Sequence, residues 1–190
     1  MKFLNLAFIL FVAVSLTAAP IKPIKKTVDV NSSKITWTAS KVTGKHFGGV
    51  KIKSGTIEMD GNKLVGGKFV VDMTSLTVED LSGKGKENLE NHLKSDDFFS
   101  IATHGEAHLT ITKVTAKAMA GEFIVDAELT IKGIKNPVKF DAKVDGNMAS
   151  GKIKIDRTKY DIKYRSGNYF QDLGDKLIYD EFDLEVNLAY

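Results

Sequence analysis

The stretch FIVDAELTI, residues 123–131, has an apolar side chain at every second position, and apart from Ile124 the residues between them are polar. A period of two is typical of a β-strand with one buried face, because successive side chains of a strand point to opposite sides. The same alternation begins near Ile35 and returns through most of the chain, up to residues 182–188. We therefore predict about eight long strands, each apolar on one face only, as in antiparallel sheets.

Short motifs predict where these strands turn or bend. Asp-Gly-Asn at 60–62, Asn-Pro at 136–137 and Asp-Gly-Asn at 145–147 are typical turn sequences. The parity of the apolar positions changes across Ser-Gly at 54–55, which predicts a β-bulge. The Pro- and Lys-containing segment 21–26 precedes the first strand, and we expect it to be flexible.

One segment interrupts the strand pattern. ENLENHLKSDDFF, residues 87–99, is predicted to form the one helix, because Leu89 and Leu93 are four residues apart and so share a helical face. Ser-Asp-Asp at 95–97 ends this helix, and the following Phe-Phe pair returns the chain to the wall. We expect the helix to cap one end of the sheet structure.

The predicted fold class is all-β. A single sheet of about eight one-faced strands would leave its apolar face in water, and one short helix is too small to cover it. Closure into an antiparallel barrel, mostly up-and-down, buries that face and removes the exposed edges. The interior of such a barrel is either just filled by side chains or holds one small ligand. A two-sheet sandwich is the structural alternative.

Residues 1–19 have the features of a secretory signal peptide. Lys2 gives a positive start, residues 3–16 are almost wholly apolar, and small residues precede Pro20. This apolar run is shorter than the ~20 residues that span a bilayer, and no later segment approaches that length. We expect an exported protein, periplasmic or extracellular, without an integral membrane segment in the mature chain.

Composition narrows the function classes further. The chain has no cysteine, so no disulfide can stabilise it, and its stability must come from an apolar core. The net charge of +3 at pH 7 is small, and the lysines alternate with apolar residues as on an outer barrel face. This pattern does not favour a nucleic-acid partner. We expect one domain, residues 27–190, and the sequence leaves a homodimer open.

The histidines do not indicate a metal centre. His104 and His108 have the spacing of a helical metal pair, but the alternation around them predicts a strand, on which they would be about 13 Å apart. One zinc ion could not bind both. His46 lies in a Gly-flanked turn and His92 on the predicted helix, and no nucleophile motif accompanies either. We predict no metal, no cofactor and no catalytic residue.

Two charged features could contact a ligand. Gly-Lys-Gly-Lys at 83–86 precedes the predicted helix and could receive an anion, although a simple loop is the favoured interpretation. Arg157 has the parity of Ile153 and Ile155, which would point it inward. A buried arginine needs a partner. We favour a structural ion pair, with Glu90 or Asp161 as candidates, over a ligand clamp.

Five segments, taken together and in this order, resemble the YceI family of polyisoprenoid-binding, lipocalin-like proteins. They are GKHFGGVKIKSGTI (44–57), GGKFVVDMTSLTVEDL (66–81), LENHLKSDDFF (89–99), LTIKGIKNPVKF (129–140) and IDRTKYDIKYRSGNYFQDLGDKLIYDEFDLEV (155–186). The resemblance implies an eight-stranded lipocalin-like barrel around a long apolar pocket, occupied by an isoprenoid chain or a similar lipid. It implies no reaction.

The predicted function is therefore non-enzymatic binding, transport or sequestration of a long apolar lipid, such as a polyisoprenoid, an isoprenoid quinone or a fatty-acid-like molecule. A filled barrel that serves as a stress-response or interaction module is one alternative. An enzyme acting on a lipid, with His46, His92 and Arg157 as the available groups, is another. The predicted ligand contacts are Trp37, Phe47, Phe69, Leu93, Phe98, Phe99, Phe123, Phe140, Arg157, Tyr160, Phe170 and Phe182, and the candidate polar-head contacts are His46, Lys84, Lys86 and His92.

Overall fold

The computed structural model describes residues 22–190. The predicted signal peptide, residues 1–19, lies outside the described residues. Within residues 22–190, no helix combines the length and apolar character needed to cross a membrane.

The described chain is built almost entirely of strands, with one α-helix and two short 3-10 helices. The strands are β1 (Ile24–Thr27), β2 (Asp29–Lys41), β3 (Gly44–Asp60), β4 (Lys63–Val78), β5 (Glu106–Ala116), β6 (Glu122–Ile131), β7 (Ile134–Asp145), β8 (Met148–Asp156) and β9 (Ile178–Ala189). The helices are α1 (Gly83–Lys94), η1 (Arg157–Tyr160) and η2 (Gly174–Lys176).

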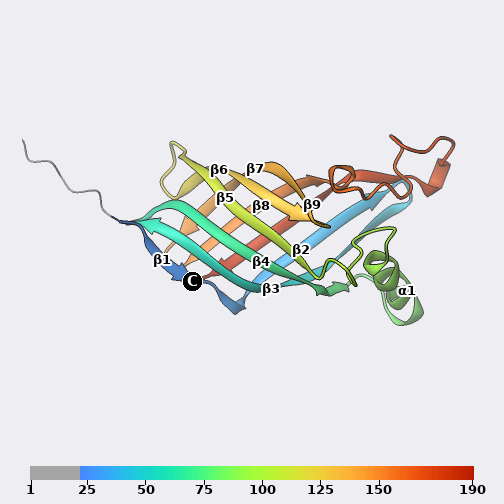
Figure 1. The fold of residues 1–190 in the computed structure, drawn as a ribbon, viewed down its shortest axis with the longest axis horizontal. Helices are drawn as coiled ribbons and strands as arrows, with labels where there is room; N and C mark the ends of the chain where they lie inside the picture. Colours follow the sequence, from blue (N-terminus) through green and yellow to red (C-terminus); the bar gives the residue numbers. More distant parts are fainter. Residues whose placement is uncertain (1–21) are drawn as a thin grey trace, which may run out of the picture.

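Eight strands close into an antiparallel barrel, as predicted from the sequence. Their order is β3-β2-β9-β8-β7-β6-β5-β4, and the pairing of β4 with β3 completes the ring. β1 adds to the outer half of β3, where Ile24 pairs with Met59. Figure 1 shows an elongated barrel with α1 and the loops between β8 and β9 at one end and β1 at the other. We call these the helix end and the hairpin end.

The period-two alternation builds the wall of this barrel. In β6 the apolar residues Phe123, Val125, Ala127, Leu129 and Ile131 are all buried, while the residues between them are partly exposed. Apolar side chains from the other strands join them in two clusters that follow one another along the barrel. The core is therefore the interior of the barrel itself.

Most predicted turns and the bulge are confirmed. The pairing of β3 with β4 shifts between Ile52 and Ser54, as expected for a bulge near 54–55. The turns after Asp60 and Asp145 also lie as predicted. The turn predicted at 136–137 is wrong, because both residues belong to β7. The chain turns instead at 132–133, where both residues have positive φ angles.

Two further expectations need correction. The leader is not wholly flexible, because residues 24–27 pair with β3. The helix begins at Gly83, four residues before the prediction, and ends at Lys94, directly before the Ser-Asp-Asp sequence that was predicted to end it. Its early turns gain an ion pair between Lys86 and Glu90, at 3.5 Å, and it ends where Ser95 adopts an extended conformation and donates its N–H to His92 O.

Two strand pairs in the barrel wall are incomplete. β4 and β5 pair only over residues 68–72 and 106–110. The parts of both strands nearer the hairpin end form no ladder with one another. β7 and β8 pair only over residues 141–145 and 148–152, so their helix-end halves are separate. Pro137 lies in this unpaired half of β7, where a residue without an N–H is tolerated because one strand edge is free.

Candidate ligand-binding cavity

The barrel encloses two adjoining cavities of about 120 and 100 Å³. Inward-pointing side chains of the strands supply most of both walls, and α1 and the loops add to the first. The cavities lie end to end and share part of their wall: Ile35, Val71, Ala107, Leu129 and Leu184 line both. The interior is thus a divided apolar tunnel and not a filled core.

The degree of burial varies around this tunnel. The inward residues of β6 are buried, whereas Phe182, Leu184 and Val186 of β9 point inward and remain only partly buried. In a close-packed interior such residues would be fully covered. Their residual exposure is to the tunnel, so apolar surface is available there for a ligand to bury.

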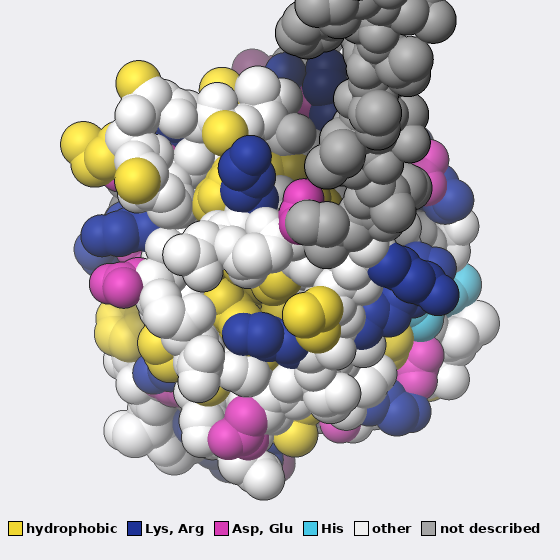
Figure 2. Space-filling model, turned by 90° about the vertical axis from the view of Figure 1, so that its left-hand side faces the viewer, with side chains coloured by type: hydrophobic (Ala, Val, Ile, Leu, Met, Phe, Trp, Pro, Cys, Tyr) yellow, Lys and Arg dark blue, Asp and Glu magenta, His cyan; other side chains and the backbone are white. Residues whose placement is uncertain are grey.

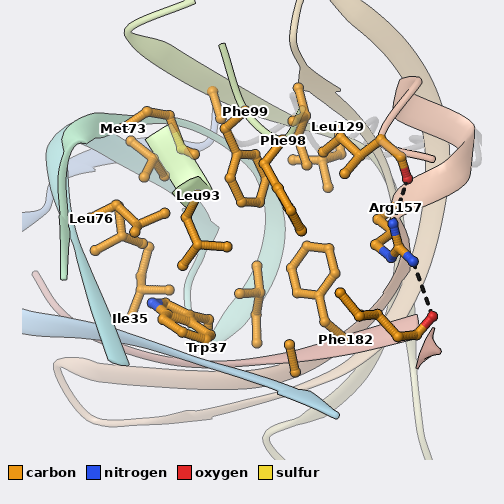
Figure 3. A pocket seen from close by; sticks show the side chains of 18 of the residues that line it. Ile35, Trp37, Met73, Leu76, Leu93, Phe98, Phe99, Leu129, Arg157 and Phe182 are labelled. Atoms are coloured by element: carbon orange, nitrogen blue, oxygen red, sulfur yellow. Dashed lines mark hydrogen bonds between the residues drawn. The ribbon is translucent and has the colours of Figure 1, made fainter. Parts of the chain in front are cut away.

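The first cavity lies at the helix end (Figure 3). Trp37 closes its floor, with the indole Nε1–H donating to Thr77 O at 3.1 Å. Phe98, Phe99 and Phe182 also point into it, and Phe99 meets Phe182 edge-on with ring centroids 6.5 Å apart. α1 contributes Leu93 alone, and none of its residues is buried, so the helix covers this end without plugging it.

The second cavity lies toward the hairpin end. Phe69 and Phe140 are its aromatic residues, and branched aliphatic side chains supply most of the remaining wall. Gly151 of β8 has no side chain, and the ring of Phe140 occupies the space beside it: a Cβ added to Gly151 would meet this ring at 3.4 Å. This cavity therefore suits a slender apolar group.

Arg157 is the charged side chain on the wall of the first cavity. It is 4% exposed, because Asp156 caps η1 by accepting the Thr158 N–H at 2.9 Å and turns the chain at the end of β8. Its guanidinium forms an ion pair with Asp180 at 3.2 Å. Asp180 is the partner, instead of the predicted Glu90 or Asp161. Burial lowers the pKa of Arg157, and the Asp180 carboxylate opposes this shift.

Three backbone carbonyls complete the surroundings of Arg157. Nε donates to Tyr179 O at 3.1 Å, Nη1 to Ile162 O at 2.8 Å and Nη2 to Ile178 O at 3.0 Å. Figure 3 shows the guanidinium at the edge of the cavity, with dashed lines for some of these hydrogen bonds. Arg157 therefore ties the loop after η1 to the start of β9, and few of its donors remain for a ligand.

The polar residues predicted to hold a head group do not line either cavity. His46 Nδ1 lies 2.7 Å from Asp80 Oδ2, and Asp80 also accepts the Phe47 N–H at 3.0 Å. Lys86 pairs with Glu90, and Lys84 is exposed on the first turn of α1. Their positions indicate roles at the base of the helix.

His92 lies in an aromatic cluster on the outside of the cavity. Its ring meets Phe98 and Tyr164 edge-on, with centroids 4.9 and 4.6 Å apart, and its Nε2 is 3.3 Å from Asp97 Oδ2. Tyr164 belongs to the loop between η1 and η2, so this cluster joins α1 to that loop. The two segments together form the cover of the helix end.

Hydrogen bonds from the backbone to two carboxylates fix the strand that leads into α1. Glu90 Oε1 accepts the Val78 N–H at 2.8 Å, and this bond lowers the pKa of Glu90 below its ordinary value. The pKa of Asp80 is also lowered: burial opposes the shift, but the hydrogen bonds from Phe47 and His46 outweigh it. Both carboxylates therefore stabilise the helix end in their charged form.

The structure places eight of the twelve predicted ligand contacts on a cavity wall. The other four lie elsewhere: Phe47 and Phe170 are 38% and 50% exposed, whereas Phe123 and Tyr160 are buried beneath the cavity surface. Within residues 22–190 the buried Tyr160 hydroxyl has no hydrogen-bond partner, and burial raises the pKa of Tyr160 to about 12. The aliphatic half of the wall was missed, although the strand parity of Ile35, Leu129 and Leu184 indicates that they point inward.

The predicted strand position of His104 is wrong, since this residue lies in the turn before β5. His108 is on β5, with Nε2 3.5 Å from Glu106 Oε2 at the barrel surface. Across the described residues 22–190, no group of three or more potential ligands could hold a metal ion.

The matching family model and two matching relatives come from comparisons of the sequence with known proteins. A model of the YceI-like domain matches residues 27–190. A UPF0312 protein of Photorhabdus laumondii is 30% identical over 111 residues, which are 52% of this chain and 51% of that protein. A UPF0312 protein of Pectobacterium atrosepticum is 35% identical over 57 residues, 30% and 29% of the two chains. The matched segments thus span about half, or less, of the length of these relatives.

Solved structures of low sequence identity share the fold. BcnA of Burkholderia cenocepacia aligns with a TM-score of 0.68 at 19% identity, over 86% of this chain and 99% of that one. A polyisoprenoid binding domain from Saccharophagus degradans aligns with a TM-score of 0.55 at 15% identity, over 85% and 95%. The YCEI protein of Campylobacter jejuni aligns with a TM-score of 0.53 at 18% identity, over 100% and 98%.

Proposed function

This chain belongs to the YceI family, and we propose that its barrel binds one long, slender lipid along both cavities, without catalysing a reaction. The observation that carries the proposal is the apolar tunnel with a wall shared by two cavities. The likeness to a polyisoprenoid binding domain supports an isoprenoid chain as the ligand class. The proposed protein is an exported carrier or sequestering protein, in keeping with the signal-peptide features of residues 1–19.

Apolar burial supplies the affinity in this proposal. Each square ångström of apolar surface removed from water contributes about 25 cal/mol, and the half-buried side chains of β9 still offer such surface. Each cavity alone is close in volume to one that holds a benzene-sized molecule. A long chain must therefore pass through the shared wall region and occupy both cavities.

The helix end favours the apolar tail of the ligand. Arg157 is the charged group there, and its ion pair and three carbonyl bonds already use most of its donors. A charged head group beside it would lose its hydration with little compensation. We place the tail in the first cavity and the polar head toward the hairpin end. The loop at Lys84 and Lys86 is the rival head-group position.

The purified protein, extracted with organic solvent, is expected to yield about one lipid per chain, identifiable by mass spectrometry. Ala107→Phe places a ring where the two cavities meet, so it should abolish binding of a long isoprenoid and retain binding of a short one. Leu81→Phe, outside both cavities, is the control. Absence of any bound lipid, together with no binding of added isoprenoids of either length, would refute the proposal.

A further inference from the structure

The two incomplete strand pairs of the barrel differ in what lies beside them. At the helix end, η1 lies against the unpaired half of β7, where Asn136 Nδ2 donates to Lys159 O at 2.8 Å. The buried Tyr160 belongs to the same short helix and packs with the core of this end. The gap between β7 and β8 is therefore filled by the chain that follows β8.

No helix or strand of residues 22–190 pairs with the corresponding edges of β4 and β5. Residues 63–67 of β4 and 111–116 of β5 diverge toward the hairpin end, as Figure 1 shows at the left of the barrel. Leu64 on one edge and Ile111 on the other both line the second cavity. Gly66 and Gly67 place no side chain over the gap. We call this gap the β4/β5 split.

Both edges of the split are basic. Residues 63–68 and 111–116 contain three exposed lysines, Lys63, Lys68 and Lys113, and no acidic residue. Within the described residues 22–190, none of these three ammonium groups forms an ion pair with a carboxylate. Three lysines without an ion pair in the described structure thus flank the β4/β5 split.

The carboxylates nearest in the strand register do not neutralise these lysines. Glu58, opposite Gly66, pairs with Lys25 at 3.2 Å. Asp126, opposite Lys113, pairs with Lys139 at 3.1 Å. Asp60 lies opposite Lys63 in the β3–β4 hairpin, and no ion pair joins these two residues in the described structure. With Asp60 as the one unpaired carboxylate opposite them in the described structure, the three lysines still leave an excess of positive charge at the split.

Exposed apolar side chains accompany this charge. Val65 at the split is 40% exposed, and Met119 in the loop after β5 and Ile24 at the start of β1 are 66% and 64% exposed. Figure 2, which views the hairpin end, shows lysine and hydrophobic side chains next to one another. Lysines close to exposed apolar side chains favour a surface of anionic lipid.

We propose that the hairpin end docks on an anionic bilayer, and that the lipid ligand passes tail first between this bilayer and the cavities through the β4/β5 split. This inference rests on the proposed function. Lys63, Lys68 and Lys113 contact lipid phosphates, while Val65 and Met119 enter the apolar boundary of the bilayer. The tail reaches the helix end through the second cavity, and the head stays beside the lysines.

Docking is tested with vesicles of phosphatidylcholine containing 30% phosphatidylglycerol, and with phosphatidylcholine alone. The intact mature chain should sediment with the former and not with the latter. Because each lysine near such a surface contributes about 1 kcal/mol, the triple variant Lys63→Glu, Lys68→Glu, Lys113→Glu should bind at least about 100-fold more weakly. Lys45→Glu, Lys159→Glu, Lys176→Glu makes the same charge change at the helix end, and it should bind within about threefold of the unchanged protein.

The route is tested by the transfer of a fluorescent isoprenoid phosphate from these vesicles to the protein. Val114→Trp introduces a large side chain on the β5 edge of the split and should slow transfer about tenfold or more. Val144→Trp is the matched control, because Val144 is another half-buried, inward-facing valine of the hairpin end, on β7. Thermal unfolding of every variant shows whether it is folded.

The inference fails separately from the proposed function. If the protein binds the isoprenoid delivered from ethanol, but vesicle binding is insensitive to the charge changes at the split, docking at the hairpin end is refuted. If Val114→Trp and Val144→Trp slow transfer equally, the split is not the route. If Lys84→Ala with Lys86→Ala slows transfer more than the split variants do, the head group enters at the helix end. If the isoprenoid binds by neither delivery, the proposed function itself is refuted.

Discussion

The helix end and the hairpin end of this barrel are closed by different kinds of interaction. At the helix end, buried or half-buried polar groups hold each element: Arg157 binds three carbonyls and Asp180, Glu90 binds the Val78 amide, and Asp80 binds the Phe47 amide. The hairpin end contains the turns between strands, the pairing of β1 with β3 and the β4/β5 split. Within residues 22–190 the buried ion pair therefore lies at the helix end, whereas the hairpin end is held by backbone hydrogen bonds such as that from Val144 N–H to Gly121 O at 2.8 Å.

This difference indicates that the two ends of the tunnel have different roles. A hydrogen bond that is lost in a buried site leaves an unsatisfied group and costs about 1–3 kcal/mol, so the helix end should open rarely. Two strand edges that are already unpaired can separate further without losing such bonds. We therefore expect the helix end to preserve the shape of the cavity and the hairpin end to admit the ligand.

The largest expected effect comes from removing the centre of the helix-end network. Arg157→Met leaves three carbonyls and Asp180 without their buried partner, and it should lower the free energy of unfolding by about 3–5 kcal/mol. Urea denaturation of purified protein measures this loss. Arg157→Met with Asp180→Asn should recover part of it. A loss below 1 kcal/mol for Arg157→Met would show that the network does not hold the helix end.

Close packing between β3 and β4 at the helix end predicts the next largest effect. A Cβ on Gly48 would lie 1.9 Å from Thr77 O and 2.9 Å from the Trp37 ring, which also donates its indole N–H to Thr77 O. Gly48→Ala must therefore move β4 or the indole, at a cost of about 1–3 kcal/mol.

Gly85→Ala is the control for Gly48→Ala. Gly85 lies within α1, and a Cβ there meets no atom within 4 Å. Alanine favours the helix by about 1 kcal/mol relative to glycine, so this variant should be slightly more stable. Thermal unfolding compares the two variants directly, and equal stability of both would show that the strands at the helix end are not tightly packed.

The barrel could be predicted from the sequence because alternation is a local property. The apolar residues at every second position of 123–131 are the buried ones in β6, and closure follows from the need to cover about eight one-faced strands. The start of α1 was misjudged because Gly-Lys-Gly-Lys at 83–86 reads as a loop, and Ser82 makes no side-chain cap.

The features that distinguish the two ends depend on contacts between distant segments. Asp180, the partner of Arg157, lies 23 residues away on β9 within an acidic run that reads as surface. The β4/β5 split follows from where pairing stops, and alternation does not fix the extent of pairing. The predicted ligand contacts are mostly aromatic, whereas the wall that the two cavities share is aliphatic.

Acid is expected to reduce the folding stability by a smaller amount, through Glu90 at the helix end. The pKa of Glu90 is lowered in the folded state, chiefly by the hydrogen bond from the Val78 amide. Its contribution to stability is therefore complete above the ordinary value of 4.5 and is lost as the pH falls through the lower folded-state pKa. The urea concentration at the midpoint of unfolding should therefore fall as the pH is lowered from 7 to 3, most steeply where Glu90 becomes protonated.

Glu90→Gln isolates that contribution. The amide can still accept the Val78 N–H, so the loss at pH 7 should be about 1 kcal/mol, and the decline toward pH 3 should be shallower than in the unchanged protein. Glu87→Gln, exposed on the same helix, should leave both the stability at pH 7 and the acid limb nearly unchanged. An acid limb of equal slope in all three proteins would exclude Glu90 as a source of the pH dependence.

The smallest expected effect concerns the helix as a gate. Leu93 is the side chain through which α1 contacts the first cavity, so Leu93→Ala would accelerate lipid exchange if the ligand left past the helix. If the ligand leaves through the split as proposed, Leu93→Ala should exchange lipid at a rate within about twofold of the unchanged protein.

Leu64→Ala removes a side chain at the edge of the split, and it should raise the exchange rate several-fold. Stopped-flow transfer of a fluorescent lipid distinguishes these results: faster exchange in Leu93→Ala alone would identify α1 as the gate and reverse the roles of the two ends.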